Sequence, residues 1–354
     1  MMTKLPDAPL LGGIDFWDHQ KKAIEIARKY ISNFTKGDTT KASLIHMPTG
    51  TGKTGVIASL ARCLPEVNSV MILSPRIALR HQLYCEIRSD FFRKLNINPD
   101  DLPKDVLEIK ESYPSDLETH GSTVLISTIQ KLDRLKKISP KDYEKLATSL
   151  SLVIFDEGHY EPSHSWSEAI RGFHSPQIIF TATPYRNDYK LFNIDISNSY
   201  SYTLKEAEDS NIVRKVEIVD CQETEDIAKF VDDIINFYNT HFTENNSAKV
   251  IVRCSMRGTI RRVANEFRVR GHECVAIHET FKDPTRPWEF RQVPSPQERE
   301  EIFWIHQYKL LEGIDDPNFQ MLALFQPLHN ARSFIQQVGR IIRNPSREPN
   351  QVFP

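Results

Sequence analysis

The sequence contains no long hydrophobic segment. None of its apolar runs reaches the ~18 residues that a membrane-spanning helix needs, and the N-terminal MMTKLPDAPLLGG has no apolar core of a secretory signal. We therefore expect no membrane partner and a cytoplasmic location. An excess of positive charge is also missing, because 45 Lys and Arg face 47 Asp and Glu, a net charge of −2. Proteins that coat nucleic acid are usually basic overall, so any nucleic acid should bind in a local groove.

The cysteines and histidines form no recognisable cluster. No two cysteines have C-x-x-C spacing, which excludes the usual disulfide framework and zinc site; they are Cys63, Cys85, Cys221, Cys254 and Cys274. His159, Glu161 and His164 lie close together without the H-E-x-x-H spacing of a metal-binding helix. His159 is expected to link the strand that precedes it to a neighbouring segment instead of binding a metal.

Short apolar segments alternate with amphipathic ones along the 354 residues, a length that suits two domains. Continuous apolar strands alternating with helices predict α/β domains with a parallel sheet covered on both faces. Residues 95–120 are predicted to be a polar surface excursion and residues 280–300 a loop, while 216–220 (VEIVD) are predicted to begin the second domain with a strand. We expect domains at 1–210 and 211–354, the second incomplete at its end.

The clearest local signal is MPTGTGKT at residues 47–54, between an apolar strand and a helix. Backbone N–H groups of the turn Thr49-Gly50-Thr51-Gly52 can hold a triphosphate. Lys53 would reach the β- and γ-phosphates, and Thr54 would ligate Mg²⁺. Met47 stands where the first glycine of this pattern is usually found.

A dinucleotide fingerprint is the alternative interpretation, because Gly50, Gly52 and Gly55 also spell G-x-G-x-x-G. That interpretation needs an acidic residue about 20 positions later to bind a ribose. The next strand ends instead in Ser74-Pro75-Arg76. A tight glycine turn without a ligand is a further alternative, and it leaves the Lys-Thr pair unexplained. A triphosphate is therefore favoured.

A second signal is LVIFDEGH at residues 152–159. Four apolar residues predict a buried strand with Asp156 at its carboxyl end, where ligands bind in such sheets. Asp156 would hold Mg²⁺ through water, and Glu157 would orient and deprotonate the attacking water. An ordinary acidic turn is the alternative, which the upstream phosphate loop makes less favoured.

Eight motifs in order resemble those of superfamily 2 helicases and translocases, over about residues 14–345. They are MPTGTGKT, SPRIALRHQ, STIQKL, DEGH, TATP, VIVRCS, LEGIDDP and QQVGRIIR. The nearest branch is that of type III restriction-enzyme motor subunits. The resemblance implies two tandem RecA-like domains with the ATP site in the cleft between them, and an ATP hydrolase that uses ATP and Mg²⁺.

The resemblance also implies roles for individual residues at the nucleotide. Gln20 would contact adenine, with Trp17 standing where relatives often have arginine. Gly313 and Asp315 would contact the ribose and the domain interface, and Gln336 would face the γ-phosphate.

Two further pairs are implied by the same resemblance. Arg340 and Arg343 would act as arginine fingers, and their spacing of three on a predicted helix places both on one side. Thr181 and Thr183 would couple hydrolysis to nucleic-acid contacts.

The resemblance implies one strand of nucleic acid held by its phosphates, with DNA expected rather than RNA. Such contacts position the chain and carry no sequence information. The matching residues are Ser74, Arg76, Thr128, Gln130 and Ser255.

Two rival classes stay open. A P-loop ATPase could remodel a protein or act on a small molecule, and a binding module could carry an inactive motor, although the catalytic residues are intact. The sequence stops 11 residues after Arg343. This predicts a missing C-terminal region or a partner subunit such as a nuclease, in restriction or antiviral defence.

Overall fold

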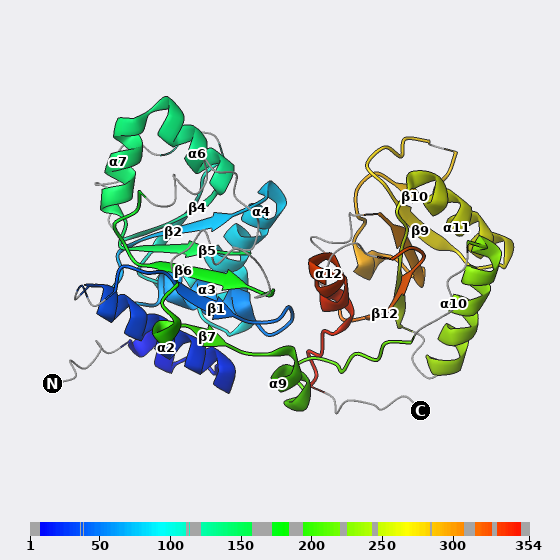
Figure 1. The fold of residues 1–354 in the computed structure, drawn as a ribbon, viewed down its shortest axis with the longest axis horizontal. Coiled ribbons are helices and arrows are strands. Elements are labelled where there is room, and N and C mark those ends of the chain that lie inside the picture. Colours follow the sequence, from blue (N-terminus) through cyan, green and yellow to red (C-terminus); the bar gives the residue numbers. More distant parts are fainter. Residues whose placement is uncertain are drawn as a thin grey trace. The chain divides into compact units, whose positions relative to one another are not determined.

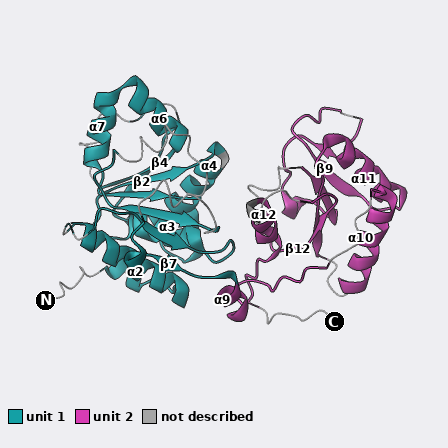
Figure 2. Ribbon diagram, viewed as in Figure 1, with its two compact units in different colours: residues 1–204 teal, residues 205–354 magenta. Residues whose placement is uncertain are grey.

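The chain divides into two compact units, residues 1–204 (unit 1) and residues 205–354 (unit 2) (Figure 2). The predicted boundary at residue 210 lies six residues beyond this division. The computed structural model describes residues 8–35, 37, 39–110, 113, 122–157, 172–183, 194–219, 225–242, 247–283, 285–307, 316–327 and 331–347.

Unit 1 is built on a seven-stranded sheet in which every pairing is parallel, in the order β3-β4-β2-β5-β6-β1-β7 (Figure 1). Its strands are β1 Ser43–His46, β2 Ser69–Ser74, β3 Asp105–Glu108, β4 Thr123–Thr128, β5 Leu152–Phe155, β6 Gln177–Thr181 and β7 Tyr200–Ser201. Met71 and Leu73 of β2 pack in one hydrophobic cluster with residues of α6 and α7, while Val70 and Ile72 are fully buried on the opposite face. Both faces of the sheet are therefore covered, as continuous apolar strands predict.

Helices complete unit 1. They are α1 Pro9–Gly12, α2 Asp18–Thr35, α3 Lys53–Arg62, α4 Ile77–Cys85, α5 Phe91–Lys94, α6 Ile129–Ile138 and α7 Pro140–Ser149. A π-helical turn at Glu86–Asp90 joins α4 to α5. Short 3₁₀ turns lie at Pro99–Asp101 and Ile196–Asn198.

Unit 2 has a five-stranded parallel sheet in the order β10-β9-β11-β8-β12. Its elements are α9 Leu204–Asp209, α10 Ile227–His241, β8 Lys249–Arg253, α11 Arg257–Val269, β9 Cys274–Ile277, β10 Glu289–Phe290, β11 Phe303–His306, β12 Phe319–Leu324 and α12 Ala331–Ile341. Val250 and Val252 pack in a cluster with α10 and α11, whereas Ile251 packs on the other face with Trp304 and Ile341. The two tandem parallel-sheet domains expected from the sequence are confirmed.

Three sequence-based element predictions are wrong. Residues 280–300, predicted as a loop, contain the short strand β10, which pairs with β9. The polar excursion at 95–120 contains β3, an edge strand fixed by the buried Arg62, which donates to the Lys104 carbonyl at 2.8 Å. The segment 216–219 forms no strand, and Ile218 and Val219 are 73% and 52% exposed. A segment with alternating apolar residues forms a strand only if it can pair with a neighbouring strand. The described edge strands of the unit 2 sheet are β10 and β12, and residues 216–219 pair with neither.

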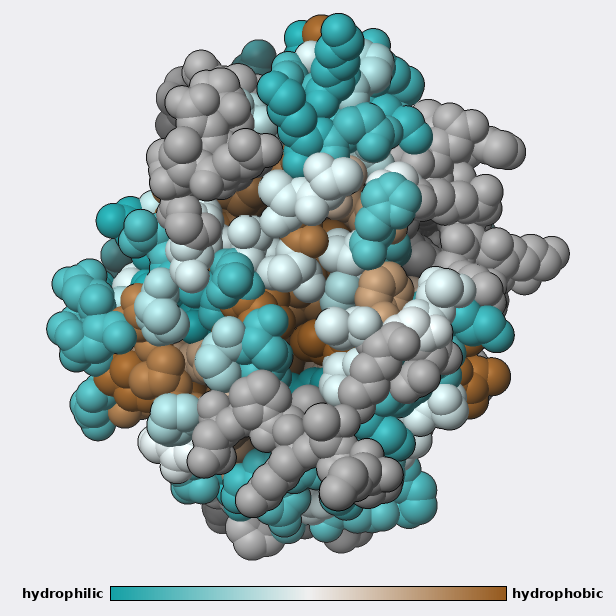
Figure 3. All heavy atoms as spheres, turned by 90° about the vertical axis from the view of Figure 1, so that its left-hand side faces the viewer, coloured by the Kyte–Doolittle hydropathy of each residue, from teal (hydrophilic) through white to brown (hydrophobic). Residues whose placement is uncertain are grey.

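Among the described residues on the face shown in Figure 3, hydrophilic side chains alternate with separate apolar patches. Over the described part of the chain, no helix combines the length and apolar character needed to cross a membrane. The cysteines in that part are all free thiols; they are Cys63, Cys85, Cys254 and Cys274.

Candidate nucleotide-binding site

The strand order of unit 1 brings the turns that follow β1, β5 and β6 to one edge of the sheet. β6 lies between β1 and β5, with His46 opposite Thr181 and Phe155 opposite Ile179. The glycine turn follows β1, and Asp156 and Glu157 follow β5. Because all three strands are parallel, their carboxyl ends meet at the same edge, which is where ligands bind in open α/β sheets.

The glycine turn has the backbone that its sequence predicts. Gly50 and Gly52 have φ of 85° and 76°, a region that glycine adopts without a steric penalty. A Cβ atom on Gly52 would lie 2.2 Å from the Gln20 side-chain nitrogen, so any other residue would displace the Gln20 amide. Helix α3 begins at Lys53, and the first N–H groups of a helix point out of its end, ready to bind an anion.

Met47, which replaces the usual first glycine of the motif, serves packing. Its side chain is fully buried, and its N–H donates to the Thr181 carbonyl at 3.0 Å. Thr51 is also buried, and its hydroxyl donates to the Pro48 carbonyl at 2.7 Å. Met47, where the common motif has glycine, therefore anchors the start of the turn to the core.

Lys53 connects the glycine turn with the acidic turn. Its Nζ lies 2.5 Å from Glu157 Oε1 and 3.8 Å from Asp156 Oδ1. Burial opposes the charge of Lys53, but the Glu157 and Asp156 carboxylates outweigh it and raise the pKa of Lys53 above its usual value. The lysine is thus a fixed cation between two carboxylates at neutral pH.

Glu157 has an unusual backbone conformation, with a φ of 53°. Such a conformation costs a non-glycine residue of the order of 1 kcal/mol and occurs preferentially at functional sites. It turns the chain sharply after the buried Asp156, whose N–H is held by the Leu73 carbonyl at 3.0 Å. The strained turn presents consecutive carboxylates to the same lysine.

Gln20 closes the other side of the turn. Its Nε2 donates to the Gly52 carbonyl at 3.2 Å, and its Oε1 accepts from the Trp17 N–H at 3.0 Å. The side chain is therefore oriented by two backbone groups beside the glycine turn. The adjacent His19, which the sequence-based reasoning did not single out, contacts the same turn through the Thr51 carbonyl at 2.8 Å.

Thr181 and Thr183 lie at the end of β6, between the two halves of the site. The Thr183 N–H donates to Thr181 Oγ1 at 3.1 Å, and both residues are buried. This local bond fixes the turn that separates Asp156 from the end of β1.

Triphosphate and Mg²⁺ fit the residues present. Gly50 and Gly52 have no side chains that would block a phosphate at the turn. Thr54 follows Lys53 at the start of α3, and the Asp156 carboxylate lies 3.8 Å from the Lys53 ammonium. Hydroxyl and carboxylate oxygens are ligands that Mg²⁺ prefers.

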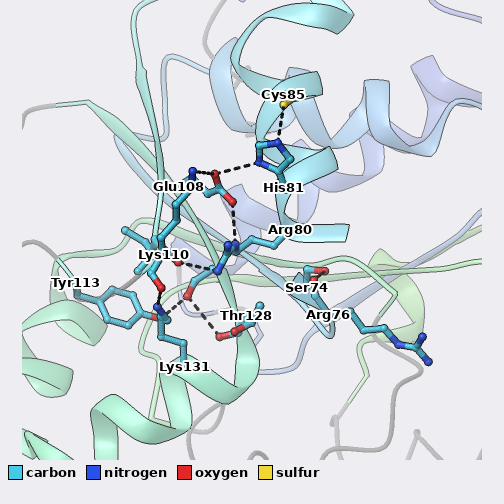
Figure 4. A network of polar contacts seen from close by, with 12 residues as sticks. Ser74, Arg76, Arg80, His81, Cys85, Glu108, Lys110, Tyr113, Thr128 and Lys131 are labelled. Carbon is cyan, nitrogen blue, oxygen red and sulfur yellow. Dashed lines mark hydrogen bonds and ion pairs between the residues drawn. The ribbon is translucent and has the colours of Figure 1, made fainter. Parts of the chain in front are cut away.

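Four of the residues expected to contact nucleic acid, Ser74, Arg76, Thr128 and Gln130, lie at the same edge of unit 1, further along the sheet, whereas Ser255 lies in unit 2. Ser74 at the end of β2 is the register partner of Thr128 at the end of β4. Gln130 Nε2 donates to the Pro75 carbonyl at 2.7 Å, which joins the two turns. Arg76 is exposed and points away from the neighbouring polar network (Figure 4).

That network is centred on Glu108 of β3, whose side chain is only 3% exposed (Figure 4). Arg80 Nε lies 3.0 Å, His81 Nδ1 3.2 Å and Lys110 Nζ 3.3 Å from its carboxylate oxygens. Hydrogen bonds to these groups outweigh burial and lower the pKa of Glu108. The network holds α4 against the edge strand, and the sequence carried no signal for it because β3 was not predicted.

In unit 2, Arg253 lies at the carboxyl end of its strand, next to a buried histidine. Arg253 of β8 is the register partner of His306 of β11, and Arg253 donates to Ser255 Oγ at 3.1 Å. Burial, together with the charges of Arg253 and Arg340, lowers the pKa of the fully buried His306 to about 3. His306 is therefore neutral at pH 7.

The predicted geometry of the two arginines is wrong for Arg343. Helix α12 ends at Ile341, and Arg343 lies beyond it in an antiparallel bridge with Val213. The Arg214 N–H donates to the Ile342 carbonyl at 2.7 Å, which draws the chain out of the helix. Gln336 and Arg340 do share the helix, four residues apart. Burial lowers the pKa of Arg343 to about 10, which leaves it charged at pH 7.

Some predicted residues lie outside the described part of the chain. They are His159, Glu161, His164, Cys221, Gly313 and Asp315.

Comparisons with known proteins agree with the motifs. Residues 13–186 match the family model described as type III restriction enzyme, res subunit, which covers most of unit 1. The predicted resemblance to superfamily 2 motors is confirmed. A search of curated proteins found no significant match.

Solved structures with a similar fold match nearly the whole chain. S. cerevisiae Dbp5 bound to RNA and ADP BeF3 is 16% identical, with a TM-score of 0.55 over 95% of this chain and 84% of that chain. The ATP-dependent type ISP restriction-modification enzyme LlaBIII bound to DNA is 16% identical, with a TM-score of 0.61 over 95% of this chain and 27% of that chain. A fragment described as an HsdR subunit of a type I restriction enzyme from Vibrio vulnificus is 18% identical, with a TM-score of 0.59 over 97% and 64%.

Proposed function

We propose that this protein is a nucleic-acid-dependent ATPase that moves along DNA as a superfamily 2 helicase or translocase. The observation that carries the proposal is the contact of Lys53 with Glu157 and Asp156 beside a glycine turn, at one edge of a parallel sheet. A catalytic base, a metal-binding carboxylate and a phosphate-binding cation lie together there, which is the set of groups that phosphoryl transfer needs.

The N–H groups of the turn from Thr49 to Gly52 bind the triphosphate, and Gln20 orients the base. Thr54 and Asp156 would hold Mg²⁺, which would supply neutralising charge to the phosphate oxygens. Lys53 exchanges its bond to Glu157 for one to the γ-phosphate. Glu157, released from the lysine, accepts a proton from the attacking water.

Unit 2 supplies positive charge to the same reaction. Arg340 and Arg343 stabilise charge on the transferring phosphoryl group, and Gln336 orients it. Gly313 and Asp315 contact the ribose. Hydrolysis then changes the grip of Ser74, Arg76, Thr128, Gln130 and Ser255 on the phosphates of one strand, with Thr181 and Thr183 coupling the two events.

The cellular setting proposed is restriction or antiviral defence in the cytoplasm, with a nuclease or another partner subunit. Its support is the res-subunit match and the restriction enzymes among the similar structures, one of which is bound to DNA. The chain spans 27% of that enzyme, so further segments or subunits would supply the remaining activities.

The test is steady-state ATP hydrolysis by the wild type and Glu157→Gln, without nucleic acid and with single-stranded DNA, duplex DNA or RNA. We expect stimulation by DNA in the wild type and none in the variant. Glu144→Gln, at an exposed position on α7, is the matched control and should behave as the wild type. Hydrolysis that is the same under all four conditions would favour the protein-remodelling ATPase instead.

A further inference from the structure

An aromatic row lies beside the glycine turn of unit 1. The His19 and Tyr202 rings stack with centroids 4.2 Å apart and planes at 1°, and Trp17 lies 5.5 Å from His19. His19 and Tyr202 are 5% and 6% exposed. The chemistry proposed above uses neither of them, although their packing is among the closest ring contacts in the unit.

His19 controls one peptide group of the turn. Its Nε2 lies 2.8 Å from the Thr51 carbonyl, and since a carbonyl can only accept, Nε2 carries the proton. In a planar trans peptide, the C=O of Thr51 and the N–H of Gly52 point in opposite directions. Holding the carbonyl toward His19 therefore aims the Gly52 N–H away from it, as a phosphate-binding donor requires.

Tyr202 connects the same ring to the end of unit 1. Its N–H donates to the His46 carbonyl at 2.9 Å, and Ser201 is 2.8 Å from His46 Nδ1. Two residues later the chain reaches Leu204, where unit 1 ends. The segment that leads into unit 2 is thus attached both to β1 and, through the stacked rings, to the glycine turn.

We propose that His19 is a positioning residue that transmits occupancy of the glycine turn through Tyr202 to the segment entering unit 2. The inference rests on the proposed binding of ATP at this turn. A phosphate drawn to the Gly52 N–H shifts the Thr51–Gly52 peptide and with it the Nε2 bond. Close-packed interiors transmit such shifts, so the stacked ring passes the displacement to Tyr202.

The ring and the N–H donor can be separated by substitution. His19→Phe keeps an aromatic ring and loses the donor, whereas His19→Gln keeps a donor and loses the ring. Tyr202→Leu removes the stack from the other side, and Tyr202→Phe is the matched control that keeps it. The experiment measures the Kd of a non-hydrolysable ATP analogue by calorimetry, and hydrogen exchange of the peptide spanning residues 200–206 with and without the analogue.

In the wild type and Tyr202→Phe, we expect the analogue to slow exchange of this peptide by about fivefold. His19→Phe should raise the Kd by about tenfold, the effect of one lost buried hydrogen bond. His19→Gln and Tyr202→Leu should keep the Kd within about threefold and lose the exchange response. If His19 and Tyr202 only stabilised the fold, their variants would lower the melting temperature and would change the Kd and the exchange response together.

An exchange response that persists in both His19→Gln and Tyr202→Leu, or that is missing in a wild type that binds the analogue, would overturn the inference alone. Failure of the wild type to bind the analogue would instead overturn the proposed ATP site, and the inference with it. Tyr202→Leu tests the same stack if His19→Gln does not fold.

Discussion

The two units share a parallel sheet but place opposite electrostatics at the carboxyl ends of their strands. In unit 1, one lysine lies between two carboxylates, and the pKa of Lys53 is raised. In unit 2, Arg253 and Arg340 surround a buried imidazole, and the pKa of His306 is lowered to about 3. Two parallel sheets, of seven and five strands, thus carry a pair of carboxylates around a lysine in one unit and cations around a neutral histidine in the other.

The difference teaches that the fold determines where a site lies, whereas the side chains determine its chemistry. Unit 1 has the groups proposed to bind a nucleotide and activate water. The described strand ends of unit 2 bring Arg253 close to His306, and Arg253 can stabilise negative charge. Each prediction below would remove or sharpen this division.

The largest effects are expected from Lys53→Ala and Arg343→Ala. Both should lower kcat for ATP by about 10³-fold or more, because in the proposed reaction each residue supplies a cation to the transferring phosphoryl group. Lys53→Ala should also weaken ATP binding by at least about tenfold, while Arg343→Ala should leave the Kd within about threefold. Measurement of kcat and of ATP affinity by calorimetry checks both.

Arg262→Ala, on the exposed face of α11, is the control for Arg343→Ala and should keep wild-type kcat. An Arg343→Ala variant with normal kcat would show that unit 2 does not contribute to hydrolysis in the proposed way.

A smaller effect is expected at Gly52. Gly52→Ala places a Cβ 2.2 Å from the Gln20 side-chain nitrogen at a φ of 76°, so the Gln20 amide must leave the Gly52 carbonyl and the backbone is strained. We expect ATP affinity to fall by about 10–100-fold and stability to fall by about 2–3 kcal/mol in urea denaturation. Gly271→Ala in unit 2 has a φ of 82° with no atom within 4 Å of its Cβ, so it should cost only about 1 kcal/mol and leave ATP affinity unchanged. Equal stability losses would show that crowding by Gln20 is unimportant.

The pH dependence of stability should report the electrostatics of unit 2. The pKa of His306 is about 3 in the folded chain and 6.5 for an ordinary histidine. Between pH 3 and pH 6.5, the His306 side chain is therefore protonated in the unfolded chain and neutral in the folded chain. Stability should therefore be lost as the pH falls below 6.5, at a limiting slope of about 1.4 kcal/mol per pH unit. His306→Gln should flatten this dependence in urea denaturation between pH 7 and pH 5, whereas His174→Gln, at an exposed position, should not. A wild-type slope retained by His306→Gln would assign the effect to other groups.

The smallest effect is expected at Arg76. Loss of one phosphate contact should weaken DNA binding by about fivefold and reduce the slope of log K against log salt by about 1. Fluorescence anisotropy with single-stranded DNA at several salt concentrations measures both. Lys145→Ala on α7 is the exposed cationic control, and an equal change there would indicate a non-specific loss of charge.

Much of the fold could be predicted from apolar segments. The strand at 123–128 and the helix at 129–138 have the bounds that periodicity indicates, because both bury a continuous face. β3 was missed since an edge strand has few apolar residues, and 216–219 was misassigned because alternation does not reveal whether a pairing partner exists. The end of α12 depended on Arg214, more than 100 residues away.

Within the candidate site, the sequence predicted residue types better than contacts. Lys53 and Glu157 were assigned from motifs, but their direct bond joins residues 104 apart and depends on the order of the strands. The stack of His19 on Tyr202 had no sequence signal, since single aromatic residues are common in any core. Chemistry that resides in a local motif could be predicted, whereas chemistry that depends on pairing distant segments could not.

The position of β1 in the sheet has a consequence for synthesis of the chain. Residues 43–46 pair with 178–181 and 200–201, so the strand that carries the glycine turn finds its neighbours only after most of unit 1 has left the ribosome. Contacts between residues so distant in sequence form late and slow folding. A nascent chain of 150 residues would expose β1 without either partner, and nucleotide added during refolding should bind only in the final kinetic phase.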